Sequence, residues 1–416
     1  MAPLPIEVDG RRQPPLGMAP EQFLRDYWQK RPLLVRGAFP GFVSPITPED
    51  LAGLACEEAA LSRVVLHDRR RDRWELRNGP FAEADFPQLP QRDWTLLVQD
   101  VDKWDQDVRA LLAAFRFLPA WRLDDIMVSF AAPGGSVGAH VDQYDVFLLQ
   151  AHGHRRWQID SRPDAPQGFR PDVELKLLST FTPDHDWVLA PGDMLYLPPG
   201  VPHHGVAQDA CLTFSVGMRA PSLAELLLDF AEELAAALPE QARYADPDLA
   251  LPSDACEIDE AAFARVRAAL AAALALPQGR IGTEVPPTGA GATAVAFDEG
   301  AMRRWFGRFI TQYRSAGELV APARTPSLKT VDDALARGGR LLRHPHARHA
   351  WAREGKRARL HANGLNFAMG ITSARRLAGS QSLASGDLDA LDADGRSALQ
   401  ALLAQGHYHL EKPRRR

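Results

Sequence analysis

The sequence of 416 residues predicts an α+β protein in which an antiparallel β-barrel or jelly roll is flanked by helices and followed by a smaller mixed domain. Between residues 121 and 220 the chain consists of short apolar segments separated by glycine, proline and aspartate, which is typical of such barrels. Residues 222–274 are rich in alanine and leucine at helical spacing instead. A stretch rich in glycine, proline, alanine and threonine follows at 277–294 and predicts a linker to the last domain.

Helices and strands can be predicted within each of these regions. The barrel strands that we predict are residues 125–131, 140–151, 155–159, 186–189, 194–197 and 212–218. Ahead of the barrel we predict a helix and a short strand within 21–36, a helix that begins at Thr47 and Pro48, and a helix over 105–115. After the linker we predict helices near 301–313, 330–336 and 395–405 and a hairpin near 352–362.

Composition excludes several classes of protein. The net charge of −5 argues against a generic nucleic-acid binder, although a local basic patch stays possible. Cys56, Cys211 and Cys256 are too few and too scattered for a disulfide framework or a zinc motif, and they suit a reducing compartment. Residues 1–18 lack the apolar core of a signal peptide, and no apolar run is long enough to cross a membrane. We therefore expect a cytoplasmic protein that enters no membrane.

The triplet His140-Val141-Asp142 and the later His203 carry the strongest chemical signal. On a strand, residues two apart point to the same face, so His140 and Asp142 would converge. With His203 from a neighbouring strand they would form a two-histidine, one-carboxylate face, which is the ligand set of non-heme Fe(II) oxygenases. A lone His-x-Asp pair is common at protein surfaces; its match with a downstream histidine is what favours a metal site.

Two glycine-punctuated stretches, residues 133–142 and 191–205, hold these ligands at spacings that resemble the two cupin motifs. Asp142 stands where plain metal cupins have a second histidine, and their later glutamate ligand has no counterpart. Both departures favour a three-ligand site over a zinc- or manganese-dependent cupin isomerase, which ranks last. The motif interval selects His203 as the ligand, and we expect His204 to point the other way.

A two-oxoacid bound to such a metal would need a cation for its far carboxylate. On the strand 155–159, Arg155 shares a face with Trp157 and Ile159, so Arg155 should point into the barrel. A structural ion pair is the alternative role for this arginine.

Three more side chains could line the same pocket. Ser129 and Thr213 are hydroxyls on predicted barrel strands that could assist cosubstrate binding, although a serine or threonine on a strand is more often simply packed. Tyr144 has the same parity as His140 and Asp142, so it would either line the pocket or pack in the core.

Several motifs together resemble the bacterial JmjC-type ribosomal oxygenases. They are the stretches 140–147 (HVDQYDVF), 153–157 (GHRRW), 196–203 (YLPPGVPH), 215–221 (SVGMRAP) and, near the N-terminus, 27–37 (YWQKRPLLVRG). These motifs cover about the first half of the chain, and the second half matches only in general layout.

The resemblance implies an Fe(II)- and 2-oxoglutarate-dependent protein hydroxylase that uses molecular oxygen. The bacterial members hydroxylate the β-carbon of an arginine in a large-subunit ribosomal protein, whereas animal relatives modify histidines. Carried over by position, His140, Asp142 and His203 would bind iron and form the catalytic centre, and Arg155 would bind 2-oxoglutarate. His204 departs from the pattern, because the bacterial relatives carry an acid there.

The same resemblance implies a JmjC (cupin) double-stranded β-helix with N-terminal helices, a helical dimerisation region and a C-terminal winged-helix-like domain. We accordingly expect an N-terminal extension at 1–90, the catalytic barrel at 91–221, the dimerisation region at 222–276, a linker at 277–298 and the winged helix at 299–416. A homodimer is expected, although the helical stripe could also pack within one chain.

Rival functions stay open at this point. The target could be a histidine or a protein outside the ribosome, or the barrel could be a non-catalytic scaffold on the ribosome. A winged helix indicates nucleic-acid binding by fold analogy alone.

Overall fold

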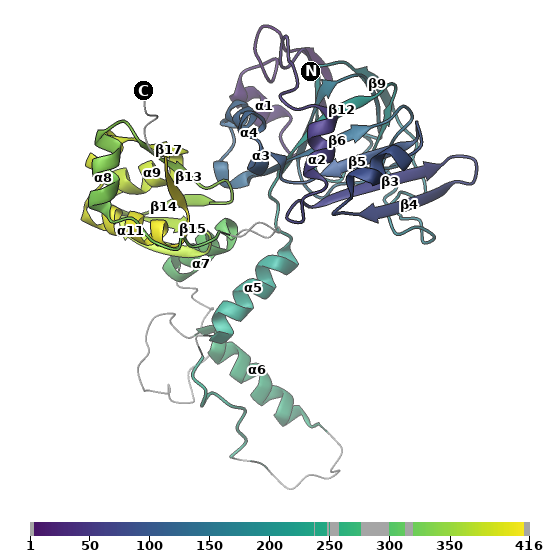
Figure 1. Ribbon diagram of the computed structural model, residues 1–416. Helices are drawn as coiled ribbons and strands as arrows, with labels where there is room; N and C mark the ends of the chain where they lie inside the picture. Colours follow the sequence, from purple (N-terminus) through teal and green to yellow (C-terminus); the bar gives the residue numbers. More distant parts are fainter. Residues whose placement is uncertain are drawn as a thin grey trace. The chain divides into compact units, whose positions relative to one another are not determined.

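The computed structural model describes residues 4–236, 238–247, 249, 258–275, 299–312 and 319–411. These residues form two compact units, one holding the chain up to Ala220 and the other most of the chain from Pro221 onward (Figure 1). Each unit has a hydrophobic core of its own.

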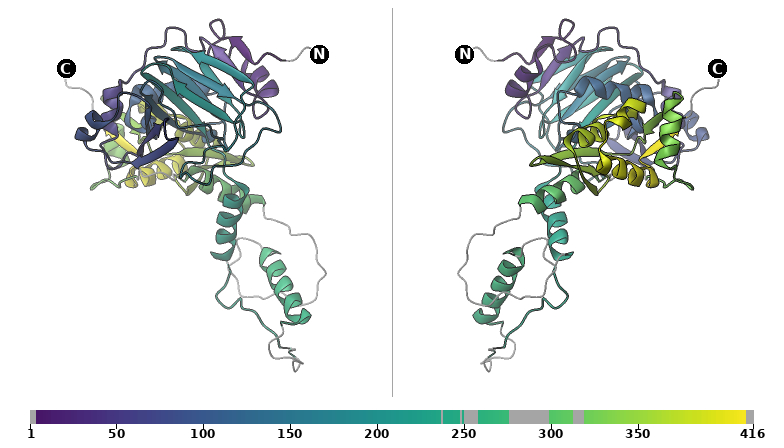
Figure 2. Two further views of the ribbon diagram at one scale, coloured as in Figure 1. Left: turned by 90° about the vertical axis from the view of Figure 1, so that its right-hand side faces the viewer. Right: turned by 90° about the vertical axis from the view of Figure 1, so that its left-hand side faces the viewer.

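The first unit is built on two sheets, which Figure 2 shows from two further sides. The large sheet has the order β1-β2-β10-β7-β12-β6-β5-β3-β4, and the small one the order β11-β8-β9. Neighbouring strands are antiparallel except β1 and β2. The strands are β1 (Glu7–Asp9), β2 (Leu33–Arg36), β3 (Ser62–Asp68), β4 (Arg73–Asn78), β5 (Trp94–Val98), β6 (Leu123–Ala131), β7 (Val146–His152), β8 (Arg155–Ile159), β9 (His185–Leu189), β10 (Met194–Leu197), β11 (His203–Ala207) and β12 (Cys211–Met218).

The two sheets face each other across an apolar core. Leu148 and Leu195 of the large sheet pack in one cluster with Trp157 and Ile159 of the small sheet. Every residue of β12 is buried, because the opposite face of the large sheet is also covered, by a cluster that includes Phe23. The barrel that the sequence predicts is confirmed, and its interior is the space between the two sheets.

Short helices of the first unit lie outside the sheets. They are α1 (Pro20–Asp26), α2 (Pro48–Leu54), α3 (Val101–Trp104) and α4 (Gln106–Ala110), with 3₁₀ turns at Glu83–Gln88, Leu111–Phe115 and Ala120–Arg122. The start of α2 is as predicted: the Thr47 hydroxyl accepts the Asp50 amide at 3.1 Å, and Asp50 accepts the Thr47 amide at 2.8 Å. This reciprocal capping satisfies two amides that the first helical turn leaves without partners.

The second unit combines helices with two three-stranded sheets, β17-β13-β18 and β14-β15-β16. Its core gathers aliphatic side chains such as Leu360, Leu377 and Leu399. Its elements are α5 (Leu223–Ala236), α6 (Glu260–Ala275), α7 (Glu299–Thr311), α8 (Leu328–Ala336), β13 (Arg340–Arg343), β14 (His349–Glu354), β15 (Arg357–Ala362), β16 (Leu365–Met369), α9 (Ile371–Gly379), β17 (Ser382–Leu383), α10 (Ser385–Asp389), α11 (Ala393–Ala404) and β18 (Tyr408–Glu411).

Some predicted elements differ from the structure. The predicted strand 140–151 is wrong at its start, because β7 begins only at Val146 and His140 forms an isolated bridge to His203. Strands β3, β4 and β5 escape prediction. Charged residues obscure the apolar alternation of β3 and β4, and β5 is a short run, WTLLV, without alternation. The helical region 222–274 is two helices, and the described residues between them, 238–247, 249 and 258–259, are not helical.

The predicted linker 277–298 lies outside the described residues, and the domain boundaries stay predictions. Within the described ranges, no helix combines the length and the apolar character that crossing a membrane requires.

Candidate metal centre

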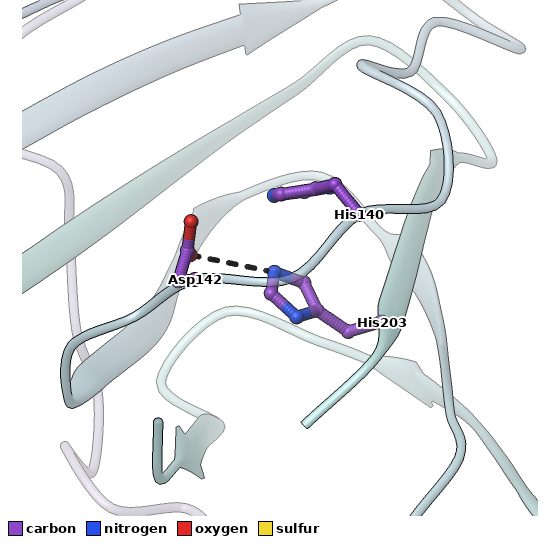
Figure 3. Close-up of side chains that lie close together, drawn as sticks. All are labelled: His140, Asp142 and His203. Atoms are coloured by element: carbon purple, nitrogen blue, oxygen red, sulfur yellow. Dashed lines mark ion pairs between the residues drawn. The ribbon is translucent and has the colours of Figure 1, made fainter. Parts of the chain in front are cut away.

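His140, Asp142 and His203 converge between the two sheets of the first unit. His140 and Asp142 lie in the segment between β6 and β7, and His203 opens β11. Backbone hydrogen bonds of 3.0 Å in both directions hold His140 against His203. One ligand atom from each of the three residues lies within 4.8 Å of the others, and Figure 3 shows the rings and the carboxylate facing a common point.

Both imidazole rings are oriented by backbone carbonyls. Nδ1 of His140 lies 3.0 Å from the Gly138 carbonyl, and Nδ1 of His203 lies 2.9 Å from the Val201 carbonyl. A carbonyl only accepts, so each Nδ1 carries the proton and each Nε2 keeps its lone pair. Nε2 of His203 lies 3.6 Å from Asp142 Oδ2. The unprotonated nitrogens therefore face the carboxylate, which is the arrangement that a divalent cation requires.

Burial, helped by the neighbouring His140, lowers the pKa of His203 to about 4. The ring is therefore neutral at physiological pH, which is the protonation state that binds metal.

Gly138 controls the orientation of His140. Its φ of +81° lies in the left-handed region, and a Cβ atom there would stand 2.5 Å from Leu177 Cδ2 and 3.2 Å from Trp74. Gly138→Ala must therefore move the carbonyl that orients His140. Because loss of such an outer contact typically weakens metal binding by about 10- to 100-fold, we expect a drop of that size in Co(II) affinity, measured by isothermal titration.

Gly53→Ala is the matched control, since a Cβ atom on that helical glycine meets nothing within 4 Å. Equal Co(II) affinity in the Gly138 and Gly53 variants would show that Gly138 does not set the ligand geometry.

Arg155 is a buried cation without an anion. It has 2% relative exposure and shares the barrel interior with Trp157, as the alternation on β8 predicts. Nη2 donates to the Gly205 carbonyl at 3.2 Å, Cζ lies 5.0 Å from the Trp157 ring centre, and Nε has no partner among the described residues. Burial lowers the pKa of Arg155, and no carboxylate of the described residues forms an ion pair with it. An unpaired buried charge is costly, so the structure fits a ligand carboxylate at this guanidinium.

Gly205 leaves the space that Arg155 occupies. It pairs with Trp157 across β11 and β8, and a Cβ atom at Gly205 would stand 2.6 Å from Arg155 Nε and 2.7 Å from the Trp157 ring. Only glycine at position 205 leaves room for the Arg155 guanidinium over the Trp157 indole.

Ser129 and Thr213 face each other in register on β6 and β12, and both are buried. The Thr213 hydroxyl donates to Gln150 Oε1 at 3.2 Å. Cys211, on the same face of β12 as Thr213, packs with residues of β6 and β11, and the charge of Arg155 acts to lower the pKa of this thiol although burial raises it. The structure therefore places Thr213 and Ser129 on the interior face, close to the arginine. His204 lies on the other face of β11, with its ring edge-on to Phe181.

Sequence reasoning missed Asp125, which shares the inner face of β6 with Ser129. Burial and the neighbouring Asp100, Asp124 and Asp102 raise the pKa of Asp125 to about 7. Its charge also acts on Tyr144, whose pKa is raised by burial and by Asp142. Asp125 accepts the Asp100 amide at 3.1 Å and forms no ion pair with a described basic residue, so it is a buried acid without a countercharge. The sequence signal that could have identified Asp125 is its position four residues before Ser129, which puts both side chains on the same face of the strand.

A double-sheet barrel with a His-Asp-His centre is the arrangement of non-heme Fe(II) oxygenases. The sequence matches the JmjC domain family over residues 110–226 and the family described as ROXA-like winged helix over residues 294–409.

Similar proteins identify the family within this class. The chain is 35% identical to the ribosomal protein uL16 3-hydroxylase of Escherichia coli over 321 residues, which cover 77% of this chain and 79% of that protein. It is 44% identical to a probable ribosomal oxygenase of Haemophilus influenzae over about half of each chain. The crystal structure of E. coli YcfD superposes with a TM-score of 0.77 at 32% identity, covering 95% of this chain and 99% of that one. The chain therefore belongs to the ribosomal oxygenase family.

One solved neighbour bears on the centre itself. A structure of E. coli YcfD, described as a ribosomal oxygenase in complex with cobalt and 2-oxoglutarate, matches with a TM-score of 0.74 at 31% identity.

Proposed function

We propose that this protein is an Fe(II)- and 2-oxoglutarate-dependent hydroxylase that adds oxygen to the β-carbon of an arginine in ribosomal protein uL16. The observation that carries the proposal is the pairing of an open three-ligand face with a buried, anion-free arginine in one barrel. Fe(II) has the ligands it prefers, and 2-oxoglutarate has a partner for its far carboxylate. The names of the E. coli relatives supply the substrate protein and the cosubstrate.

Each side chain of the centre has a defined task in this reaction. His140, Asp142 and His203 would hold the iron through one ligand atom each. Arg155 fixes the far carboxylate of 2-oxoglutarate, and Thr213 and Ser129 offer hydroxyls nearby. Bound iron would supply the oxidation, in which molecular oxygen gives one atom to the C–H bond of the substrate and the other to 2-oxoglutarate, which becomes succinate and carbon dioxide. The buried Trp157 and Ile159 keep water away from the cosubstrate.

Asp125 favours arginine over histidine as the target. A guanidinium next to Asp125 would restore the ionised form of the carboxylate and satisfy a buried acid that has no countercharge among the described residues. The planar fork of arginine suits a carboxylate better than an imidazole does.

The direct test is incubation of purified enzyme with uL16, Fe(II) and 2-oxoglutarate, followed by peptide mass spectrometry and a succinate assay. We expect one added oxygen on an arginine peptide, only when 2-oxoglutarate is present, with succinate formed in proportion. Addition to a histidine would keep the chemistry and refute the target residue. Succinate without any modified peptide would refute uL16, and the absence of both would make a scaffold the better explanation.

A homodimer through α5 and α6 is the second part of the proposal. Leu226 and Phe230 of α5 pack on the Trp305 cluster of α7, and the Trp305 indole donates to Asp229 at 2.8 Å. Other apolar side chains of these helices are exposed, namely Leu223, Leu227 and Leu228 on α5 and Phe263, Val266 and Leu270 on α6. Positions 263, 266 and 270 lie on one helical face. A second copy of this chain would bury both apolar surfaces.

Light scattering tests the dimer. One chain has a mass of 45.8 kDa, and we expect the wild-type protein to have twice this mass. Burial of these leucines and the phenylalanine would stabilise the association. The double variant Phe263→Glu/Leu270→Glu should give the single-chain mass. Val43→Glu, at an exposed valine of the first unit, is the control and should stay dimeric. A single-chain mass for the wild type would contradict the dimer.

A further inference from the structure

The hairpin of β3 and β4, at one edge of the large sheet, concentrates positive charge (Figure 1). Residues 62–78 contain six arginines and three acids, a net charge of +3 in a chain whose net charge is −5. The arginines are Arg63, Arg69, Arg70, Arg71, Arg73 and Arg77, and all six are exposed. A positive region of this density on an acidic protein indicates a partner of opposite charge.

Among the described residues, ion pairs leave three of the six arginines of the hairpin without an acidic partner. Arg63, Arg70 and Arg73 form no ion pair with any residue that the structure describes. The pair between Arg71 and Asp68, at 3.3 Å, is itself largely exposed to solvent, so it screens little. Asp72, one of the three acids of the hairpin, forms an ion pair at 2.7 Å with Arg170, which lies outside the hairpin.

The hairpin is held next to the metal centre. Arg69 Nη2 donates to the Gly134 carbonyl at 2.6 Å, in the loop that leads to His140. The Trp74 indole stacks on His67 at 3.8 Å and lies over Gly138, whose carbonyl orients the His140 ring. The charged turn between β3 and β4 is therefore fixed relative to the catalytic pocket.

We propose that this hairpin, residues 62–78, binds the phosphate backbone of RNA, so that the enzyme meets its protein target in RNA-bound form. This inference rests on the proposed function. The proposed substrate side chain is a cationic arginine, which a cationic hairpin beside the pocket would repel. Phosphates bound to the hairpin would offset this repulsion. Guanidinium forks match phosphate oxygens, and the turn at 68–73 presents no apolar side chain that would suit a hydrophobic peptide.

Fluorescence anisotropy with a labelled RNA stem-loop, titrated at several salt concentrations, tests the inference on the full chain. The test variant is Arg70→Ser/Arg71→Ser/Arg73→Ser, and the control is Arg11→Ser/Arg12→Ser/Arg31→Ser. Each triple removes three positive charges and one exposed ion pair of the first unit, Arg71–Asp68 or Arg11–Asp9. Thermal melting checks that both variants are folded.

We expect the test triple to bind RNA at least about tenfold more weakly at low salt. The slope of log affinity against log salt concentration should become shallower by about 2 to 3, since each phosphate contact contributes roughly 0.7 to 0.9. The control triple should behave like the wild type, and Arg→Lys at the three test positions should keep most of the salt slope. Absence of RNA binding by the wild type, or equal loss in both triples, overturns the proposal. Competition by polyglutamate as strong as by RNA would assign the hairpin to an acidic protein instead.

Hydroxylation of isolated uL16 separates this inference from the proposed function. The test triple should modify the isolated protein at least as fast as the wild type does, because Arg70, Arg71 and Arg73 contact none of the metal ligands and their removal only lessens repulsion of a cationic target. Loss of RNA binding with unchanged hydroxylation supports the hairpin assignment. RNA binding without any hydroxylation would leave the hairpin assignment standing and refute the uL16 hydroxylase.

Discussion

His140→Ala is expected to reduce 2-oxoglutarate-coupled hydroxylation by more than about 1000-fold while the protein stays folded. The ring supplies one of three metal ligands, and the metal contributes several kcal/mol to the reaction, of which each 1.4 kcal/mol corresponds to about a factor of ten in rate. Its side chain is only partly buried, so its removal leaves no large cavity. Co(II) titration and the succinate assay, performed on the same preparation, measure both losses.

His204→Ala is the matched control for that experiment. It removes an imidazole adjacent in sequence to His203 but on the other face of β11, against Phe181. Its Co(II) affinity should stay near that of the wild type. Strong Co(II) binding by His140→Ala together with a loss in His204→Ala would refute this ligand set.

Arg155→Met is expected to raise the apparent KM for 2-oxoglutarate by about 100-fold. Truncating one partner of a buried charged pair costs roughly 2–5 kcal/mol, which brackets that change. Arg155→Lys should recover little of the loss, because an ammonium cannot reproduce a planar two-point contact. Initial rates of succinate formation over a range of 2-oxoglutarate concentrations measure the change.

The same substitution should stabilise the ligand-free protein, although it weakens 2-oxoglutarate binding. Arg155 is buried without an anion among the described residues, so its replacement by a methionine of similar length relieves an unpaired charge and should raise the melting temperature. Added 2-oxoglutarate, with Mn(II) in place of iron, should stabilise the wild type but not the variant, because only ligand that binds the native state shifts unfolding. An equal rise in melting temperature for both proteins would mean that the carboxylate binds elsewhere.

How far the sequence predicts this site depends on the kind of information each residue requires. Local spacing is sufficient to bring His140 and Asp142 together with His203, and alternation on one strand is sufficient to turn Arg155 inward. The convergence does not need the regular strand that the sequence predicts around His140: a single bridge to His203 and the left-handed turn at Gly138 achieve it.

Other parts of the site depend on which distant segments of the chain pair with one another, and a single sequence does not reveal that pairing. Asp125 gains its importance because Asp100, Asp102 and Tyr144 are brought close by the tertiary fold. Gly205 must be glycine because β11 pairs with β8 in the register that places it on Trp157. Strands β3 and β4 escape prediction because they form the charged edge of the sheet, where an apolar alternation is weakest.

The central claim is that the oxygen added to the substrate comes from molecular oxygen activated at this centre. The most direct measurement is hydroxylation of uL16 under oxygen-18 gas in ordinary water, with mass spectrometry of the modified peptide and of the succinate produced. We predict one heavy oxygen atom on the arginine peptide and one in succinate, and no labelled product with His140→Ala. A modified peptide that carries only ordinary oxygen, or a product that persists in His140→Ala, would contradict the claim.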